Sequence, residues 1–262
     1  MKGILRLIAL HLLLFATVAL FAGNPWRSVR LEGEPEAIDD IELLADGPEP
    51  LVRDWLVPVF QEYLERILGV RPPVVEAPSG RFTIVLGAGE LARANGLDVE
   101  ALPPEGYYIR RSGKLLFLCG KDDPAQIPQK NFWKMRFPRG SVSAAYDFLE
   151  RFAGCVFAFP NPQAEALPPS AALKLPPVLD ITEAPDFTMR DIEVNEYGYP
   201  CKGAMDVLDS RGVQPLKRQS LSLRLDQANI PFGHGLVFHD LVERFAKSNP
   251  EFFALMPDGG RY

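Results

Sequence analysis

The sequence predicts an α/β protein of the α+β kind, in which a small mixed sheet is flanked by helices. Three observations predict this class. Over residues 51–159 the apolar periodicity changes in the order helix, strand, hairpin, helix, strand. A proline-rich stretch, residues 161–185, follows as a semi-rigid connector. After Pro185 a second run of strand-forming residues begins, which indicates a second domain.

Length and composition fit this organisation. The 262 residues suffice for one large domain or two smaller ones, and we expect two: residues 24–181, connector included, and residues 182–262. Hydrophobic residues make up 47% and charged residues 24%, which supplies a core. The net charge is −6 and the sequence contains no basic block, so nucleic acid is not an expected partner.

Residues 1–23 have the features of a secretory signal peptide. Lys2 and Arg6 precede an apolar run, residues 7–22, which ends in small residues. We expect cleavage near Ala22-Gly23 and a secreted or periplasmic mature protein without membrane contact. The alternative is an uncleaved membrane anchor, for which the run is somewhat short.

The cysteines and histidines do not form a metal-binding pattern. Cys119, Cys155 and Cys201 are too few and too widely spaced for a disulfide framework, although one oxidised pair stays open. Cys119 and Cys155 lie in apolar, strand-like runs, where we expect buried thiols. His234 and His239 would point to different sides of a strand or helix. The sequence therefore predicts neither a metal nor a cofactor.

The first elements follow from their periodicity. Residues 28–32 can form an edge strand, and apolar residues recur at helical spacing over residues 51–67. Gly69 stands where a helix-terminating glycine is expected. Because Pro58 lies inside the helical pattern, we expect the helix to kink or restart there.

A glycine-rich turn follows a predicted buried strand, residues 82–86. Residues 87–92, Gly-Ala-Gly-Glu-Leu-Ala, formally match the dinucleotide-binding pattern GxGxxA. The helix after this turn ends within two turns, at Asn95-Gly96, and the strand with a terminal acidic residue that the pattern requires is missing. We interpret the pattern as an ordinary strand-to-helix turn.

Two strand-forming runs, residues 107–111 and 114–119, surround Ser112-Gly113 and predict a β-hairpin. The loop over residues 122–138 contains three large apolar side chains: Phe132, Trp133 and Met135. Such side chains either stack on sugar rings or fold back onto their own domain, and the second is the commoner outcome.

A second amphipathic helix begins at residue 141, with Ser141 as its expected N-cap and Gly154 as its end. Residues 155–159 are expected to form a strand that returns to the sheet before Pro160.

Three segments of this part resemble the small N-terminal α/β domain of secreted α-glucuronidases and β-hexosaminidases: residues 106–109 (GYYI), 144–150 (AAYDFLE) and 155–157 (CVF). In those enzymes the domain precedes a (β/α)8 catalytic barrel. Residues 187–190 (FTMR) look like the F-x-x-R entry strand of that barrel. The resemblance implies that residues 182–262 are the incomplete start of a (β/α)8 barrel, and that the chain is an N-terminal portion.

The last part of the chain is similar to a secreted bacterial family of unknown function, through residues 232–235 (FGHG), 249–255 (NPEFFAL) and 259–261 (GGR). Its members couple the same N-terminal domain to a hydrolase-like barrel. The family's usual H-P-E reads Asn249-Pro250-Glu251 here. The resemblance implies a glycoside-hydrolase-like protein with a carbohydrate ligand.

Arg190 is the first candidate for substrate binding, because a charged side chain inside a predicted strand needs a partner or a ligand. Its guanidinium suits vicinal hydroxyls or a carboxylate. The resemblance implies contact with sugar hydroxyls, although the family has glycine where Asp191 stands. The structural alternative is an ion pair with Glu193 or a strand neighbour, since Asp191 would face the other side of a regular strand.

Glu196 and His234 are the other substrate-binding candidates. If residues 188–194 form the first barrel strand, Glu196 lies at its carboxyl end, where barrel enzymes hold catalytic groups. The alternative for Glu196 is a solvated loop residue. His234 either hydrogen-bonds a sugar or makes a structural hydrogen bond, and Glu251 is interpreted as a cap.

Two functions follow from this reading. Glycoside hydrolysis needs two carboxyl groups across the scissile bond, and the sequence places no such pair, so the catalytic residues stay unassigned. The first function is an exported glycoside-hydrolase-like protein of carbohydrate metabolism, inactive as given. The alternative is a non-catalytic module that binds carbohydrate or serves as a scaffold. Neither specifies a substrate, linkage or oligomeric state.

Overall fold

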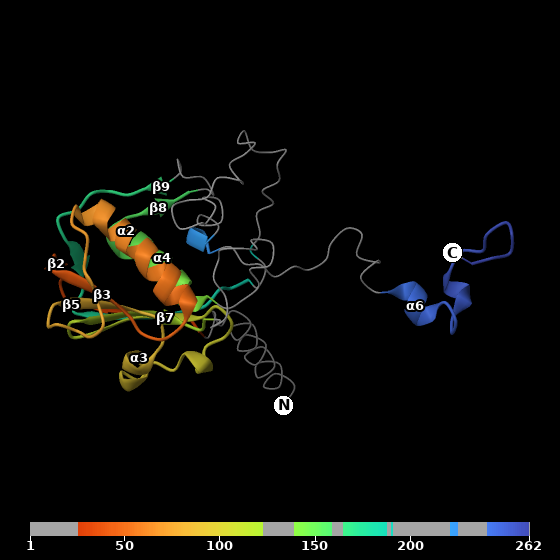
Figure 1. Cartoon of the computed structure of the whole chain (residues 1–262), viewed down its shortest axis with the longest axis horizontal. Helices are drawn as coiled ribbons and strands as arrows, with labels where there is room; N and C mark the ends of the chain where they lie inside the picture. The colour runs from red at the N-terminus through yellow and green to blue at the C-terminus, as the bar shows by residue number, and fades with distance from the viewer. Residues whose placement is uncertain are drawn as a thin grey trace, which may run out of the picture. The chain divides into compact units, whose positions relative to one another are not determined.

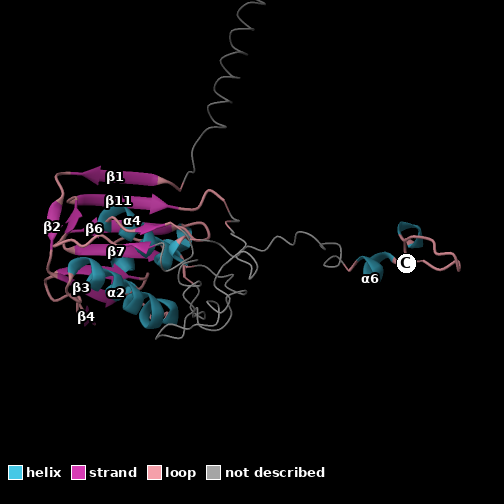
Figure 2. Cartoon of the chain, turned by 90° about the horizontal axis from the view of Figure 1, so that it is seen from above, coloured by secondary structure: helices cyan, strands magenta, loops and turns pink. Residues whose placement is uncertain are grey.

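A seven-stranded mixed sheet forms the centre of the first of two compact units, residues 1–227 (Figures 1 and 2). The computed structural model describes residues 26–122, 139–158, 165–187, 190, 221–224 and 240–261. Helices α2 (Val57–Leu68) and α4 (Gly140–Ala153) cover one face of the sheet, and the short helix α3 (Glu90–Ala94) lies on the other (Figure 1). The predicted α/β class, with a mixed sheet and flanking helices, is confirmed.

The sheet has the strand order β1-β11-β6-β7-β5-β3-β4. Its strands are β1 (Ser28–Glu32), β3 (Ile41–Ala45), β4 (Val74–Val75), β5 (Phe82–Leu86), β6 (Tyr107–Ser112), β7 (Leu115–Gly120) and β11 (Val178–Glu183). From β4 to β7 the neighbours are parallel, and from β7 to β1 they are antiparallel. In the parallel part β5 is buried along its whole length, which explains its continuous apolar sequence.

The first helix restarts near Pro58, as predicted. A π-helical segment, η1 (Leu51–Leu56), leads into α2 (Val57–Leu68), and the proline stands in the first turn of α2. A first-turn residue has no intrahelical acceptor for its N–H, so proline is tolerated there. Gly69 ends the helix with a left-handed φ of 72°, which also confirms its predicted role.

The glycine-rich turn after β5 leads into the five-residue helix α3 (Glu90–Ala94), followed by η2 (Val99–Ala101). The Asp46 carboxylate accepts hydrogen bonds from the backbone N–H groups of Leu91 (3.1 Å) and Ala92 (2.7 Å). A Cβ on Gly89 would lie 2.5 Å from the same carboxylate. The chain's own anion thus occupies the position where a dinucleotide phosphate would bind, in agreement with an ordinary strand-to-helix turn.

The second long helix, α4 (Gly140–Ala153), ends at Gly154 as predicted, but Ser141 is not its N-cap. Ser141 lies inside the helix, and its hydroxyl accepts a hydrogen bond from the backbone N–H of Gly120 at 3.0 Å. The Asp122 carboxylate accepts from the Ser141 N–H at 3.0 Å instead. A helix N–H needs an acceptor, and here the acceptor comes from a residue 19 positions earlier in the chain.

The expected strand after α4 is shorter than predicted and does not join the main sheet. It is β8 (Val156–Phe157), which pairs with β9 (Glu165–Ala166) in a separate two-stranded sheet. A second such pair joins β2 (Glu36–Ile38) and β10 (Leu173–Leu175). The predicted connector also differs: part of it forms β9, β10 and β11, and β11 lies inside the main sheet between β1 and β6. The residues of β11 alternate between partly buried and buried. Every second side chain therefore packs into the core and holds the strand there.

The two faces of the sheet have separate apolar cores. On the side of α2 and α4 the aromatic rings of Tyr63, Tyr146 and Phe157 meet edge to face. The smaller core beneath α3 contains Cys119, while Cys155 belongs to the larger one. Both thiols are buried as predicted, and burial raises the pKa of each, that of Cys155 to about 12.

Residues 228–262 form a second compact unit, of which residues 240–261 are described. It contains helix α6 (Leu241–Phe245) and the 3₁₀ turn η6 (Pro250–Phe252). The ring of Phe245 in α6 and the ring of Phe252 in η6 have centroids 6.0 Å apart. Glu251 accepts a hydrogen bond from the Asn249 side chain at 3.3 Å.

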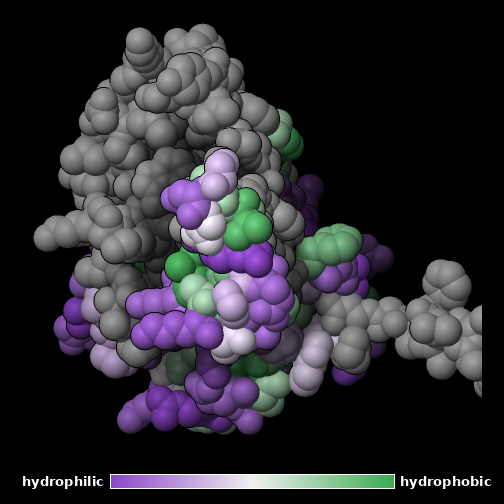
Figure 3. Space-filling model, turned by 90° about the vertical axis from the view of Figure 1, so that its right-hand side faces the viewer, coloured by the Kyte–Doolittle hydropathy of each residue, from purple (hydrophilic) through white to green (hydrophobic). Residues whose placement is uncertain are grey.

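Several predictions concern residues outside the described part: the signal peptide, the three apolar side chains of residues 123–138, Cys201 and nearly all of the predicted barrel strand. Within the described part, no helix combines the length and the apolar character that crossing a bilayer requires. Hydrophilic side chains predominate among the described residues on the side seen in Figure 3, and hydrophobic ones form small patches.

Glu42 on β3 gives the fold a dependence on pH. The side chain is buried, and its carboxylate accepts hydrogen bonds from the backbone N–H of Ser79 (2.8 Å) and the hydroxyls of Ser79 and Thr83. Burial alone would raise the pKa of Glu42, but these three hydrogen bonds outweigh it and lower the pKa below the usual 4.5. The carboxylate therefore stabilises the fold above pH 4.5, and this stabilisation is lost as the pH falls through the lowered pKa.

We expect the free energy of unfolding to fall more steeply on acidification in the wild type than in Glu42→Gln. Urea unfolding of both proteins at several pH values between about 3 and 7 measures the difference. Glu76→Gln, another glutamate without the buried hydrogen bonds described for Glu42, is the control. Parallel pH profiles for the wild type and Glu42→Gln would contradict the assignment.

Candidate functional site

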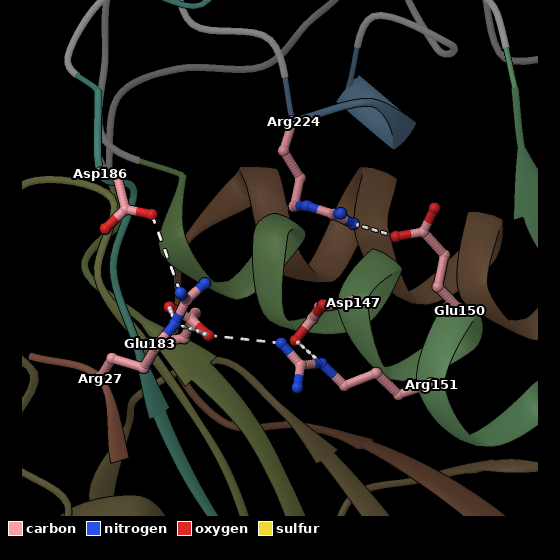
Figure 4. Close-up of polar contacts among 7 residues, drawn as sticks. All are labelled: Arg27, Asp147, Glu150, Arg151, Glu183, Asp186 and Arg224. Atoms are coloured by element: carbon pink, nitrogen blue, oxygen red, sulfur yellow. Dashed lines mark hydrogen bonds and ion pairs between the residues drawn. The ribbon is translucent and has the colours of Figure 1, made fainter. Parts of the chain in front are cut away.

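A polar cavity of about 280 Å³ lies at one end of the antiparallel part of the sheet, and Figure 4 shows seven charged residues in and around it. Charged residues dominate its walls. The lining residues are Arg27, Tyr107, Ser143, Asp147, Arg151, Glu183, Ala184, Pro185, Asp186, Arg190, Leu223 and Arg224.

Strand register brings three of these residues to the same end of the sheet. Tyr107, the first residue of β6, pairs directly with Glu183, the last residue of β11. Ser28 of β1 pairs with Thr182, so the preceding residue, Arg27, lies beside Glu183 on the side of β11 opposite to β6. Directly paired residues point to the same face, and here that face is the one covered by α4.

Helix α4 supplies the wall above these strands. Ser143, Asp147 and Arg151 follow each other at intervals of four residues, so they share one side of the helix. Arg151 Nε donates to Asp147 Oδ2 at 2.8 Å, an ion pair between successive turns. Asp147 and Ser143 are buried, which places the polar side of the helix against the sheet end.

Glu183 links the strands to the helix through two arginines (Figure 4). Its carboxylate accepts from Arg27 Nε at 2.8 and 3.0 Å and from Arg151 Nη2 at 3.3 Å. Asp186 lies 3.8 Å from Arg27 Nη1 and extends the chain of alternating charges. Opposite charges at these distances stabilise one another most where water is excluded, as at Glu183, which is 5% exposed.

Two further arginines hold later segments of the chain against this end of the domain. Arg224 Nη1 lies 2.6 Å from Glu150 on α4, although the two groups are not aligned for a hydrogen bond. Arg190 Nη2 donates to Glu105 at 2.6 Å, and its Nε donates to the carbonyl of Arg224 at 2.9 Å. Arg190 also donates to the carbonyl of Phe187.

Tyr107 contributes a phenol to the lining of the cavity. Burial, and then the negative charge of Asp147, raise the pKa of Tyr107, so the hydroxyl stays protonated at any physiological pH. The group can donate one hydrogen bond and accept others.

Of the three predicted site residues, the structure describes Arg190. It lies at the cavity with Glu105 as its ion-pair partner, a residue 85 positions away that was not among the predicted partners. Glu196 and His234 lie outside the described residues. The cavity also contains four charged residues that were not predicted: Arg27, Asp147, Arg151 and Glu183. Of these, only the spacing of Asp147 and Arg151 on a predicted helix was a usable signal.

The two buried carboxylates of the cavity are both held by one arginine. Asp147 accepts a hydrogen bond from Arg151 Nε, and Glu183 accepts one from Arg151 Nη2. Across the described residues no three His, Cys, Asp or Glu side chains are grouped in a way that could hold a metal ion.

Replacing Glu183 with glutamine should destabilise the protein. Arg27 and Arg151 would then face each other without the carboxylate between them. Loss of one partner of a buried pair costs about 3–5 kcal/mol, but these arginine side chains are 54% and 36% exposed. We therefore expect the free energy of unfolding to fall by only about 1–2 kcal/mol.

Chemical unfolding of Glu183→Gln beside Glu32→Gln tests this network. Glu32 pairs with Arg30 on the outer strand β1, where both side chains are exposed, so its removal should leave the stability unchanged. Equal stability of the two variants would show that the Glu183 network does not hold this end of the domain together.

Comparisons with known proteins give a limited result. No protein-family model matches the chain, and no curated protein sequence matches it. Among solved structures, the chain is similar to the GH20 β-N-acetylhexosaminidase from Streptomyces coelicolor A3(2), with a TM-score of 0.39 and 17% sequence identity. The N-acetyl-β-hexosaminidase of Streptomyces plicatus, in complex with Thio-NAglucal, gives 0.39 and 16%. Each match covers 62% of this chain and 26% of the enzyme, so the chain spans about a quarter of the enzymes' length.

Proposed function

We propose that the chain belongs to an exported, glycoside-hydrolase-like protein of carbohydrate metabolism, in which the described sheet domain is a non-catalytic scaffold. The motifs of residues 187–190, 232–235 and 249–255 support the carbohydrate assignment. The apolar run of residues 7–22 supports export.

The scaffold role rests on one observation, the engagement of Arg190. All three of its guanidinium nitrogens donate to protein groups: Glu105, the carbonyl of Arg224 and the carbonyl of Phe187. A guanidinium held in this way fixes the path of the chain after β11 against the domain. It has little capacity left to bind the hydroxyls of a substrate, which favours the structural alternative for this residue.

The carboxylates support the same conclusion. Two acids at a fixed separation of about 5 Å or about 6.5–9.5 Å are needed for glycoside hydrolysis, one of them protonated. Asp147 and Glu183 are instead joined through Arg151, which lies between them as a cation. Asp147, Arg151 and Glu183 therefore form one continuous ion-pair network.

We expect the purified chain to bind polysaccharide without hydrolysing glycosides. Turnover of aryl β-hexosaminides and aryl glucuronides measures the second point, with Glu196→Gln as the control, and a polysaccharide array measures the first. Turnover well above background that disappears in Glu196→Gln would overturn the non-catalytic role. An array without any bound polysaccharide would overturn the carbohydrate assignment.

A further inference from the structure

We propose that the cavity between β6, β11 and α4 binds a single neutral sugar ring, with the hydroxyls of Tyr107 and Ser143 as its anchors. The choice of a sugar among small polyhydroxyl ligands rests on the proposed function. The existence of a ligand site rests on the cavity itself.

Two hydroxyl groups at the cavity lack protein partners. Tyr107 and Ser143 are each 4% exposed, and both line the cavity. Within the described part of the chain, neither hydroxyl takes part in a hydrogen bond, although the backbone N–H of Ser143 does. Neither hydroxyl oxygen is among the described buried side-chain atoms that lack a partner, so each one faces the open space of the cavity. A hydroxyl that faces a cavity can donate and accept hydrogen bonds, so the two groups can anchor a polar molecule that enters it.

The charged side chains around these hydroxyls offer both donors and acceptors. Arg151 uses Nε and Nη2 on its carboxylate partners, and Arg27 uses Nε on Glu183. Each guanidinium has further N–H groups, and each carboxylate oxygen has more than one lone pair. A sugar hydroxyl donates one hydrogen bond and accepts others, so it can bridge an arginine and a carboxylate of this wall.

The balance of charge selects a neutral ligand over an anion. Four arginines and three carboxylates line the cavity, an excess of one positive charge. Each of the four arginines already has a carboxylate partner: Glu183 for two of them, and Glu105 or Glu150 for the others. An anionic ligand would also lie against Asp147, Glu183 and Asp186, and like charges at short range repel.

The size of the cavity limits the ligand to one ring. Its volume of about 280 Å³ falls just below the ~300–1,000 Å³ typical of sites for larger ligands. An oligosaccharide would extend out of it.

Titration of the full chain with glucose, N-acetylglucosamine and glucuronate, followed by NMR, tests the proposal. Tyr107→Phe and Ser143→Ala each remove one anchor, and each should weaken binding of the neutral sugars about 3- to 10-fold. Tyr108→Phe is the matched control. Tyr108 follows Tyr107 in β6 but does not line the cavity, and its hydroxyl donates to the carbonyl of Asp98 at 3.1 Å. This substitution should leave binding unchanged.

A stability measurement separates lost binding from lost folding. Without sugar, Tyr107→Phe should unfold at the same temperature as the wild type, because the hydroxyl that it removes has no partner among the described residues. Added neutral sugar should raise the unfolding temperature of the wild type more than that of Tyr107→Phe.

Three results would overturn the proposal: no perturbation by either neutral sugar, neutral-sugar binding that both anchor variants retain in full, or binding of glucuronate alone. If polysaccharide is bound on the array while the anchor variants have no effect, only the cavity assignment fails. If neutral sugars bind through Tyr107 while no polysaccharide is bound, the proposed function fails and the cavity assignment stands.

Discussion

Replacing Phe148 with alanine is expected to lower the free energy of unfolding by about 3–5 kcal/mol. The side chain is fully buried on α4, and its ring lies 6.1 Å from that of Phe60 on α2 and 5.5 Å from that of Phe152, centroid to centroid. Truncation removes one of the ring contacts between the two long helices and leaves a cavity that a packed core cannot close. Domains of this kind are stable by only about 5–15 kcal/mol, so a large share would be lost.

Urea unfolding followed by circular dichroism measures this loss, and Phe187→Ala is the matched control. Phe187 is 73% exposed, so its truncation should change the stability by less than about 0.5 kcal/mol. A Phe148→Ala variant as stable as Phe187→Ala would mean that α4 is not packed on α2 as the structure has it. Since α4 carries Ser143, Asp147 and Arg151, the cavity would then lose its wall.

Gly140→Ala is expected to destabilise the protein by about 3 kcal/mol, although alanine is the better helix former. A Cβ on Gly140 would lie 2.5 Å from the Gly106 carbonyl oxygen, 2.7 Å from the Lys121 nitrogen and 2.8 Å from the Gly120 Cα. All three are backbone atoms of the neighbouring strand and turn, so none can move without shifting the main chain. The overlap therefore outweighs the gain of about 1 kcal/mol in helix propensity.

Gly69→Ala provides the comparison for this effect. Gly69 has a left-handed φ of 72°, but nothing lies within 4 Å of a Cβ placed there. Its replacement should cost only the strain of the left-handed backbone, about 1 kcal/mol. Thermal or chemical unfolding of both variants gives the order, and a smaller loss for Gly140→Ala than for Gly69→Ala would contradict the close contact of α4 with β7.

Features that depend on neighbouring residues were predictable. The edge strand β1, the helix that restarts at Pro58, its end at Gly69 and the hairpin of β6 and β7 were all found where the sequence placed them. Each reflects local backbone preference or a period of apolar residues a few positions apart. The same reasoning was wrong for the cap of α4, because the acceptor, Asp122, lies 19 positions before the donor.

The sequence by itself determined the class of the fold, the positions of its main helices and the hairpin, and the resemblance that motivates a carbohydrate function. Only the tertiary structure decided which charges meet. Arg27 and Glu183 are 156 positions apart, and Arg190 and Glu105 are 85 apart. The physical reason is that strand register and helix docking, set by burial of apolar side chains all over the sheet, bring these charges together. No local pattern encodes that register, so the cavity at the sheet end could be found only in the folded chain.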